Sequence, residues 1–216
     1  MEITELMQKK LNNGREYRAL TMNAINDDEF IVEGYATTFD ESYHLYSYLD
    51  ENGKEIEVKE MVDKNAFANC DMTDVIFQYD HEGRVYARLS NNTMGLETDE
   101  HGLKTRAYLG GTNIGRNLYE EIKGGYTNKI SFGFIVNKAK MVRNSEGGYT
   151  RIIQEIKKLF DVSAVSYPQN EFTEISARKH CEGEIAAYET ERLEAEKREH
   201  QKEELMNRLR GLRNGN

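Results

Sequence analysis

The chain has 216 residues, of which 38% are hydrophobic and 31% are charged, and its formal net charge at pH 7 is −9. This length fits one domain of ordinary size with extensions, and the 13 Tyr and 8 Phe can still supply a core because each ring buries a large apolar area. The negative charge argues against general nucleic-acid binding, since a phosphate backbone needs clustered Lys and Arg.

The distribution of apolar residues and cysteines excludes several further classes. No apolar stretch approaches the length of a membrane span, and the first residues, MEITELMQKK, lack the basic start and apolar run of a secretory signal. Cys70 and Cys181 lie far apart, which gives poor support for a zinc site or a disulfide framework and suits a reducing compartment. We therefore expect a soluble protein that is intracellular at synthesis, with no membrane partner.

The first expected element is a short amphipathic helix at residues 2–12, where apolar side chains recur at helical spacing and Gly14 follows as a stop. From about residue 16 to 176 the chain changes to short β-rich runs, and strands are expected at 29–39, 74–81, 103–109 and 129–136.

Residues 129–136 alternate clearly. Ile130, Phe132, Phe134 and Val136 share one face, whereas Ser131, Gly133 and Ile135 share the other. Before this strand, Asn113–Lys123 is expected to be helical, with Thr112 or Asn113 as the N-cap and Gly124 just past the end.

Residues 151–165 (RIIQEIKKLFDVSAV) can be interpreted in two ways. The apolar residues fit a helical stripe, while the β-branched content and the neighbouring strands favour a strand paired with residues 129–136. We take the strand as the expectation.

Residues 179–216 form a highly charged extension with no proline after Pro168 and strong helix propensity. Two interpretations remain open: a solvated charged helix that only confers solubility, or an address tag that docks onto a partner helix through Leu205, Leu209 and Leu212.

Three residues could together form a catalytic group. Nucleophilic hydrolysis by serine needs a hydroxyl on a rigid element, a base within hydrogen-bond reach and a third group that orients the base. Ser131 lies within an expected strand, His81 follows the end of another, and Asp161 lies between Phe160 and Val162. Taken alone, each of these signals is weak, because most such residues are structural.

Several stretches, in this order and spacing, resemble the prohead protease family of tailed bacteriophages, which is similar in fold to the herpesvirus assembly proteases. The matching pieces are IVEGYATTFDES (31–42), VDKNAF (62–67), VIFQYDHEGRVYARLS (75–90), GLETDEHGLKTRAYL (95–109), KGGYTNKISFGF (123–134) and FDVSAVSYPQN (160–170). The resemblance implies an α+β, mainly β fold: a compact antiparallel β-barrel with peripheral helices. We expect residues 1–15 to be an N-terminal helix, 16–178 the protease domain and 179–216 a charged helical extension.

The resemblance also implies the roles of individual residues. Ser131 would be the nucleophile and His81 the general base. Asp161, where the family usually has Glu, would orient His81, with a carboxylate that reaches one methylene less far. In the herpesvirus relatives a second histidine takes this place, but neither His44 nor His101 falls in a matching motif.

Nearby residues have competing interpretations. Gly133 could donate its amide to an oxyanion hole, allow close approach of a substrate backbone, or be a bulge glycine. Ser163 and Ser166 are interpreted as strand residues that pack or cap, and the adjacent His180 and Cys181 as incidental neighbours that do not bind a metal.

The function implied is endoproteolysis inside the assembling procapsid, in the host bacterial cytoplasm. The expected partners are the major capsid protein and the scaffolding protein, with cleavage of the scaffold, of a scaffold-like capsid region and of the protease itself. No cofactor, metal or nucleic acid is expected, and self-association stays open. The alternative is a catalytically silent assembly factor with the same fold; an unrelated metal-dependent hydrolase is remote because clustered ligands are scarce.

Overall fold

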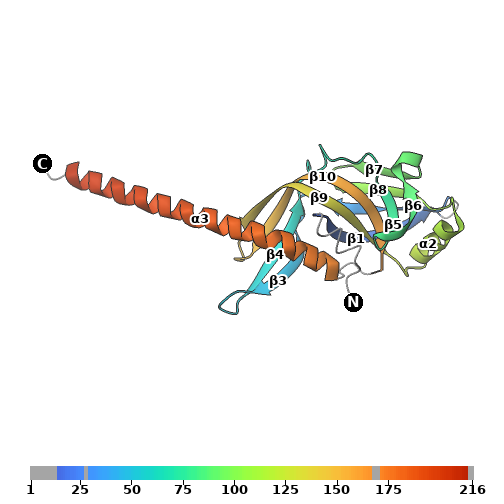
Figure 1. Cartoon of the computed structure of the whole chain (residues 1–216), viewed down its shortest axis with the longest axis horizontal. Coiled ribbons are helices and arrows are strands. Elements are labelled where there is room, and N and C mark those ends of the chain that lie inside the picture. The colour runs from blue at the N-terminus through green and yellow to red at the C-terminus, as the bar shows by residue number, and fades with distance from the viewer. Residues whose placement is uncertain (1–13, 27–28, 167–170, 214–216) are drawn as a thin grey trace.

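The computed structural model describes residues 14–26, 29–166 and 171–213. The helix expected at residues 2–12 lies outside the described residues. Within them, the chain forms ten strands, one short 3-10 helix and two α-helices (Figure 1). The elements in chain order are β1 (Glu16–Asn26), β2 (Ile31–Thr38), β3 (Tyr43–Leu49), β4 (Glu55–Val62), β5 (Ile76–Tyr79), β6 (Glu82–Arg88), η1 (Leu89–Asn91), β7 (Met94–Thr98), β8 (Gly102–Tyr108), α2 (Asn113–Lys123), β9 (Lys129–Arg143), β10 (Tyr149–Val165) and α3 (Glu171–Arg213).

All ten strands belong to one sheet, in the order β3-β4-β10-β9-β1-β2-β8-β7, with β5 and β6 attached beside β10. Most pairs are antiparallel, but β10 pairs in parallel with β4 along its first half and with β5 along its second. The mainly β expectation is confirmed. Closure into a barrel is not found, since no ladder joins β6 to β7 among the described strands.

The buried apolar residues form two clusters, and the larger one includes one face of β9. Ile130, Phe132 and Phe134 are fully buried there, as the alternation of residues 129–136 predicts, and the two phenylalanine rings stack with their centroids 4.5 Å apart. Ser131 and Gly133 therefore lie on the opposite face of β9, where strand geometry places every second side chain.

The approach to β9 is fixed by the end of α2. The N-cap is Thr112, whose Oγ1 accepts from the Gly115 amide at 3.0 Å. At the other end Gly125 takes φ +77°, its amide donates to the Ile122 carbonyl, and the Tyr126 amide donates to the Glu121 carbonyl. This pair of bonds is a Schellman motif, so the positive φ falls on Gly125, one residue later than the expected helix stop at Gly124.

The ambiguous segment 151–165 is strand, as expected, and it lies within β10. Its helix-like pattern has a physical cause: the register between β9 and β10 shifts near Glu155, Ile156, Lys158 and Asp161. Each irregularity adds a residue to one strand and breaks the two-residue alternation. Residues three apart, such as Ile153 and Ile156, can then both be fully buried.

The first part of α3 packs on the sheet beside β1, β3 and β9, and the rest projects far beyond it (Figure 1). Cys181 is fully buried against β3 and β4, and the Tyr149 hydroxyl donates to Glu189 Oε1 at 2.9 Å. Further along, Leu193, Leu205, Met206 and Leu209 are exposed. None of the described helices is long and apolar enough to cross a membrane.

The docked part of α3 is joined to the sheet by a buried group of charges, which we call the ionic cluster: Glu16, Arg18, Glu60, Arg151 and Glu184. Arg18 binds both oxygens of Glu60, at 2.5 and 2.7 Å. Arg151 binds both oxygens of Glu184, at 2.9 and 2.7 Å, and also Glu16. The cluster thus connects β1, β4, β10 and α3.

Candidate active site

His81 lies at the tip of the two-residue hairpin between β5 and β6. Asp80 and His81 both have positive φ, +48° and +60°, as the tight hairpin turn that matches strand twist requires. Asn and Gly are the usual residues at such positions; an imidazole here is held in a sparsely populated conformation, which is a common feature of functional sites.

The turn is held by hydrogen bonds to the end of β10. The Asp80 amide donates to the Ala164 carbonyl at 2.9 Å, and the Ser166 amide donates to Asp80 Oδ1 at 3.1 Å. The Tyr79 hydroxyl also hydrogen-bonds the Ser166 hydroxyl. These contacts hold the turn that carries His81. Ser166, expected to be a strand residue that packs or caps, lies just past the end of β10 and hydrogen-bonds this turn.

Asp161 follows an irregularity in β10, where the register shifts between Leu159 and Asp161. Such bulges re-aim side chains near active sites. Asp161 lies opposite Gly133 of β9, and a Cβ atom at position 133 would approach Asp161 Oδ2 to 2.6 Å and Tyr17 Cε1 to 2.9 Å. Glycine at 133 therefore makes room for the carboxylate.

The Gly133 amide is also a candidate oxyanion donor. β9 is paired on both sides at this residue, with Tyr17 of β1 and Asp161 of β10. Because strands pair with Gly133 on both sides, its backbone lies inside the sheet and not at a surface that a substrate could reach. This favours a role in making space for Asp161 over donation of the amide to a substrate.

The three residues singled out from the sequence meet in one hydrogen-bonded chain. Ser131 Oγ lies 2.7 Å from His81 Nε2, and His81 Nδ1 lies 2.5 Å from Asp161 Oδ1. The residues are separated by 50 and 80 positions in sequence. All three are nearly fully buried, with 3%, 4% and 1% of their surface exposed.

The chemistry of the partners assigns the protons. An ionised carboxylate can only accept, so Nδ1 carries the imidazole proton and donates to Asp161, which leaves the Nε2 lone pair to accept from the Ser131 hydroxyl. This is the arrangement that nucleophilic attack by serine requires: the base is within reach of the hydroxyl, and a third group fixes its tautomer.

Two residues of the N-terminal part of the described chain surround this site. The Tyr17 ring packs on the imidazole of His81, with centroids 4.4 Å apart, and burial followed by the Asp161 charge raises the pKa of Tyr17, so it stays neutral. The Arg15 guanidinium stacks over the Phe160 ring and lies 3.9 Å from Asp161 Oδ2. Neither was expected from the sequence, because no local motif marks them.

The other histidines considered are engaged elsewhere. His44 Nδ1 lies 3.1 Å from Glu57 Oε1 at the surface, and the His101 ring packs edge-on against Tyr35. Ser163 is closer to the chemistry than expected: its hydroxyl donates to Asp161 Oδ1 at 2.9 Å. The signal that could have identified it is the spacing, since residues two apart in a strand share a face.

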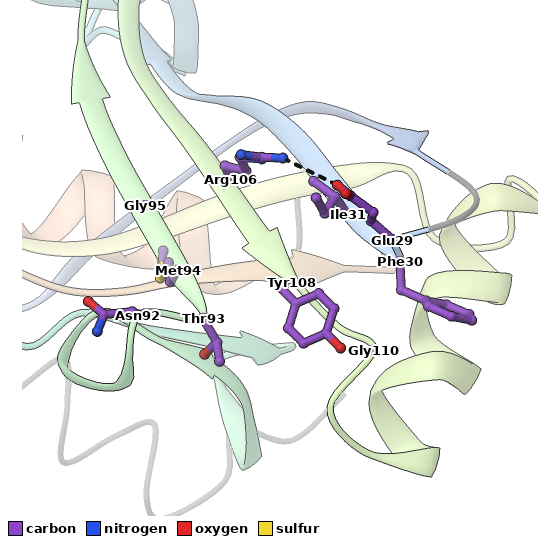
Figure 2. A pocket seen from close by; sticks show the side chains of 10 residues that line it. All are labelled: Glu29, Phe30, Ile31, Asn92, Thr93, Met94, Gly95, Arg106, Tyr108 and Gly110. Atoms are coloured by element: carbon purple, nitrogen blue, oxygen red, sulfur yellow. Dashed lines mark ion pairs between the residues drawn. The ribbon is translucent and has the colours of Figure 1, made fainter.

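A pocket of about 620 Å³ lies apart from these residues, at the edge strand β7, the end of β8 and the start of β2 (Figure 2). Phe30, Met94 and Tyr108 contribute apolar surface, and Glu29 and Arg106 form an ion pair at 3.9 Å. Its described lining includes neither Ser131, His81 nor Asp161, so the pocket is not the place where these three residues would react.

Comparison with known proteins gives one decisive match. The family model described as caudovirus prohead serine protease matches residues 18–189. No curated protein matches the chain. Among solved structures, that of the bacteriophage T4 capsid assembly protease, gp21, is similar with a TM-score of 0.40 and 13% identity, covering 70% of this chain and 96% of that chain. The family match spans most of the chain and includes all three residues of the hydrogen-bonded chain, and we conclude that this protein belongs to the caudovirus prohead serine proteases.

Proposed function

We propose that Ser131 is the nucleophile, His81 the general base and Asp161 the orienting carboxylate of a serine endopeptidase that acts in phage capsid maturation. The observation that supports these roles is the unbroken chain of hydrogen bonds from Ser131 Oγ through both ring nitrogens of His81 to Asp161. The serine protease family of the chain supplies the reaction class.

The reaction then follows from the proton positions. His81 Nε2 takes the Ser131 proton as Oγ attacks the scissile carbonyl, and the imidazolium returns this proton to the leaving amine. The acyl-enzyme is hydrolysed when His81 takes a proton from a water molecule that attacks the ester carbonyl. The acyl product then leaves, and His81 returns the proton to Ser131 Oγ. Asp161 holds the reactive tautomer and stabilises the imidazolium, an effect that is large because the group is buried and poorly screened.

The decisive test is replacement of the nucleophile. Ser131→Ala should lower the rate of cleavage of co-expressed capsid or scaffolding protein on the order of a millionfold, as loss of a triad serine does. Mass spectrometry of the cut sites measures this, and Ser145→Ala, in an exposed turn, is the matched control. Wild-type cleavage by purified Ser131→Ala would end the assignment.

We infer that the substrates are the scaffolding protein or a scaffold-like region of the major capsid protein, together with the protease itself, and that cleavage occurs inside the procapsid. The support is the prohead family of the chain. A silent assembly factor, the alternative, has no need of the aligned Ser131–His81–Asp161 chain, and the same mass-spectrometric map separates the two functions.

We further propose that the projecting part of α3 delivers the protease to the scaffold and is later trimmed. Its exposed Leu205 and Leu209 lie four residues apart, on one face of a helix that leaves the domain (Figure 1). Because Cys181, Glu184 and Glu189 are built into the sheet contacts, we place the functional boundary after Glu189, where the family match also ends.

Two truncated chains, one ending on each side of this boundary, test the delivery role of α3. A chain that ends after Leu193 should keep its cleavage rate in solution and enter procapsids poorly, as measured by the amount of protease in purified procapsids. A chain that ends after Arg178 is the contrast, since it loses Glu184 and should be unstable. Packaging of the 1–193 chain as efficient as that of the full chain contradicts the delivery role.

A further inference from the structure

Ser163 is a buried hydroxyl within hydrogen-bond reach of the proposed catalytic residues. It lies on β10 two residues after Asp161, has no exposed surface, and donates from Oγ to Asp161 Oδ1 at 2.9 Å. Across the strand pair it lies directly opposite Ser131. It is therefore located between the nucleophile and the orienting carboxylate, on the same face of the sheet.

Asp161 Oδ1 is the oxygen that also binds His81. It accepts a hydrogen bond from the Nδ1–H of His81 at 2.5 Å and another from the hydroxyl of Ser163 at 2.9 Å. Two donors on one oxygen define the plane and rotamer of a carboxylate more closely than one donor does.

The other side of the carboxylate is confined as well. Oδ2 occupies the space that a side chain at Gly133 would fill, and Arg15 lies 3.9 Å from it. The Asp161 side chain is thus held between the donors on Oδ1 and the surfaces around Oδ2. In this arrangement Ser163 is a neutral donor to Asp161 that can be removed by substitution without changing the backbone or the imidazole.

We propose that Ser163 is a positioning residue of the protease: its hydroxyl holds Asp161 in the orientation that fixes the tautomer of His81. The proposal rests on the role assigned to Asp161 above. A purely structural role explains the residue less well, because alanine fills nearly the same volume in a buried strand, and a buried hydroxyl is costly unless it is bonded. The partner of this hydroxyl is the carboxylate of the proposed triad.

Ser163→Ala tests the proposal. A hydrogen bond to a charged group is among the stronger ones in proteins, so kcat should fall by about 10- to 100-fold, with KM changed by less than about threefold because Ser163 acts through Asp161. Ser163→Thr, which keeps the hydroxyl, should recover most of the lost kcat. The matched control is Thr105→Val, which removes a hydroxyl that is only 2% exposed on β8.

A double-mutant cycle separates positioning from packing. In an Asp161→Asn background, Ser163→Ala should change kcat by less than about twofold, since the carboxylate that it positions is already lost. Thermal unfolding of each variant shows that the fold is kept. Wild-type kcat in Ser163→Ala, or an equal loss in both backgrounds, overturns the proposal.

The outcomes also separate this proposal from the proposed function. Activity retained by Ser131→Ala removes the catalytic assignment itself. An inactive Ser131→Ala and an impaired Asp161→Asn, together with a fully active Ser163→Ala, remove only the positioning role.

Discussion

Two buried polar networks share the strand β10, and they are built in opposite ways. In the ionic cluster Arg18 and Arg151 each bind two or more carboxylates, and Glu16 and Glu60 each bind both arginines. In the catalytic chain one hydrogen bond joins Ser131 to His81, and His81 lies in a turn with two positive φ angles. Alternation along β1 places Arg18 and Tyr17 on opposite faces of the sheet, one beside each network.

The difference shows how one sheet can combine stability with reactivity. Redundant ion pairs satisfy the desolvated charges and tolerate small movements, whereas a single line of hydrogen bonds leaves Nε2 and Oγ able to exchange a proton. The pKa of Glu60 shows the effect of the ionic cluster. Burial would raise this pKa, but the charges of Arg18 and Arg151 and their hydrogen bonds lower it to about 2.

The largest expected effect tests the catalytic network alone. Asp161→Asn keeps the shape of the side chain but can stabilise the wrong tautomer of His81, so kcat should fall about 10⁴-fold. The thermal midpoint should change by only a few degrees, because the ionic cluster is untouched. Peptide cleavage kinetics and calorimetry measure the two quantities. A fully active Asp161→Asn would mean that another group orients the base.

The next effect tests the ionic cluster alone. Arg151→Met removes a cation that binds Glu16, Glu60 and Glu184, so the two buried carboxylates Glu16 and Glu60 keep only the charge of Arg18. Loss of one partner of a buried ion pair costs about 3–5 kcal/mol, which urea unfolding can measure.

The specific activity of the folded fraction of Arg151→Met should stay near that of the parent protein, since no contact of Ser131 or His81 changes. Arg106→Met, at an arginine that is 56% exposed in its side chain, should cost less than about 1 kcal/mol. Equal destabilisation by the two changes contradicts the distinction between buried and surface pairs.

A smaller effect concerns acid. Glu60 has a folded pKa of about 2, below the ordinary glutamate value of 4.5, so it favours folding above pH 4.5 and loses this contribution as the pH falls towards 2. A difference of this size is worth about 3 kcal/mol. Unfolding free energies measured by urea titration between pH 6 and 3 should therefore decline, with the steepest fall below about 4.5, and Glu60→Gln should flatten this part of the curve.

The sequence predicted the parts of the site that have a local signal. The alternation around Ser131 gave the correct face of β9, and the caps of α2 were readable from Thr112 and Gly124. Ser131, His81 and Asp161 were weak candidates individually and became strong only through the order of the motifs.

Other features could not be predicted because they depend on pairing between distant segments. The parallel partners of β10 and the ionic cluster arise from contacts over 33 to 135 positions of sequence. The bulges in β10 gave a strand the residue spacing that is typical of a helix. The contact of Ser163 with Asp161 depends on the orientation of the Asp161 carboxylate, which the sequence does not contain.

The tight turn that carries His81 also restricts how this part of the chain can vary in length. Strands pair with a period of two, so one residue inserted between Tyr79 and Glu82 would reverse the facing of β6 or change the turn class. Either outcome moves Nε2 of His81 out of reach of the Ser131 hydroxyl. Surface loops commonly tolerate insertions, but an insertion in the turn between Tyr79 and Glu82 should abolish activity. This turn is best left unaltered when the enzyme is engineered.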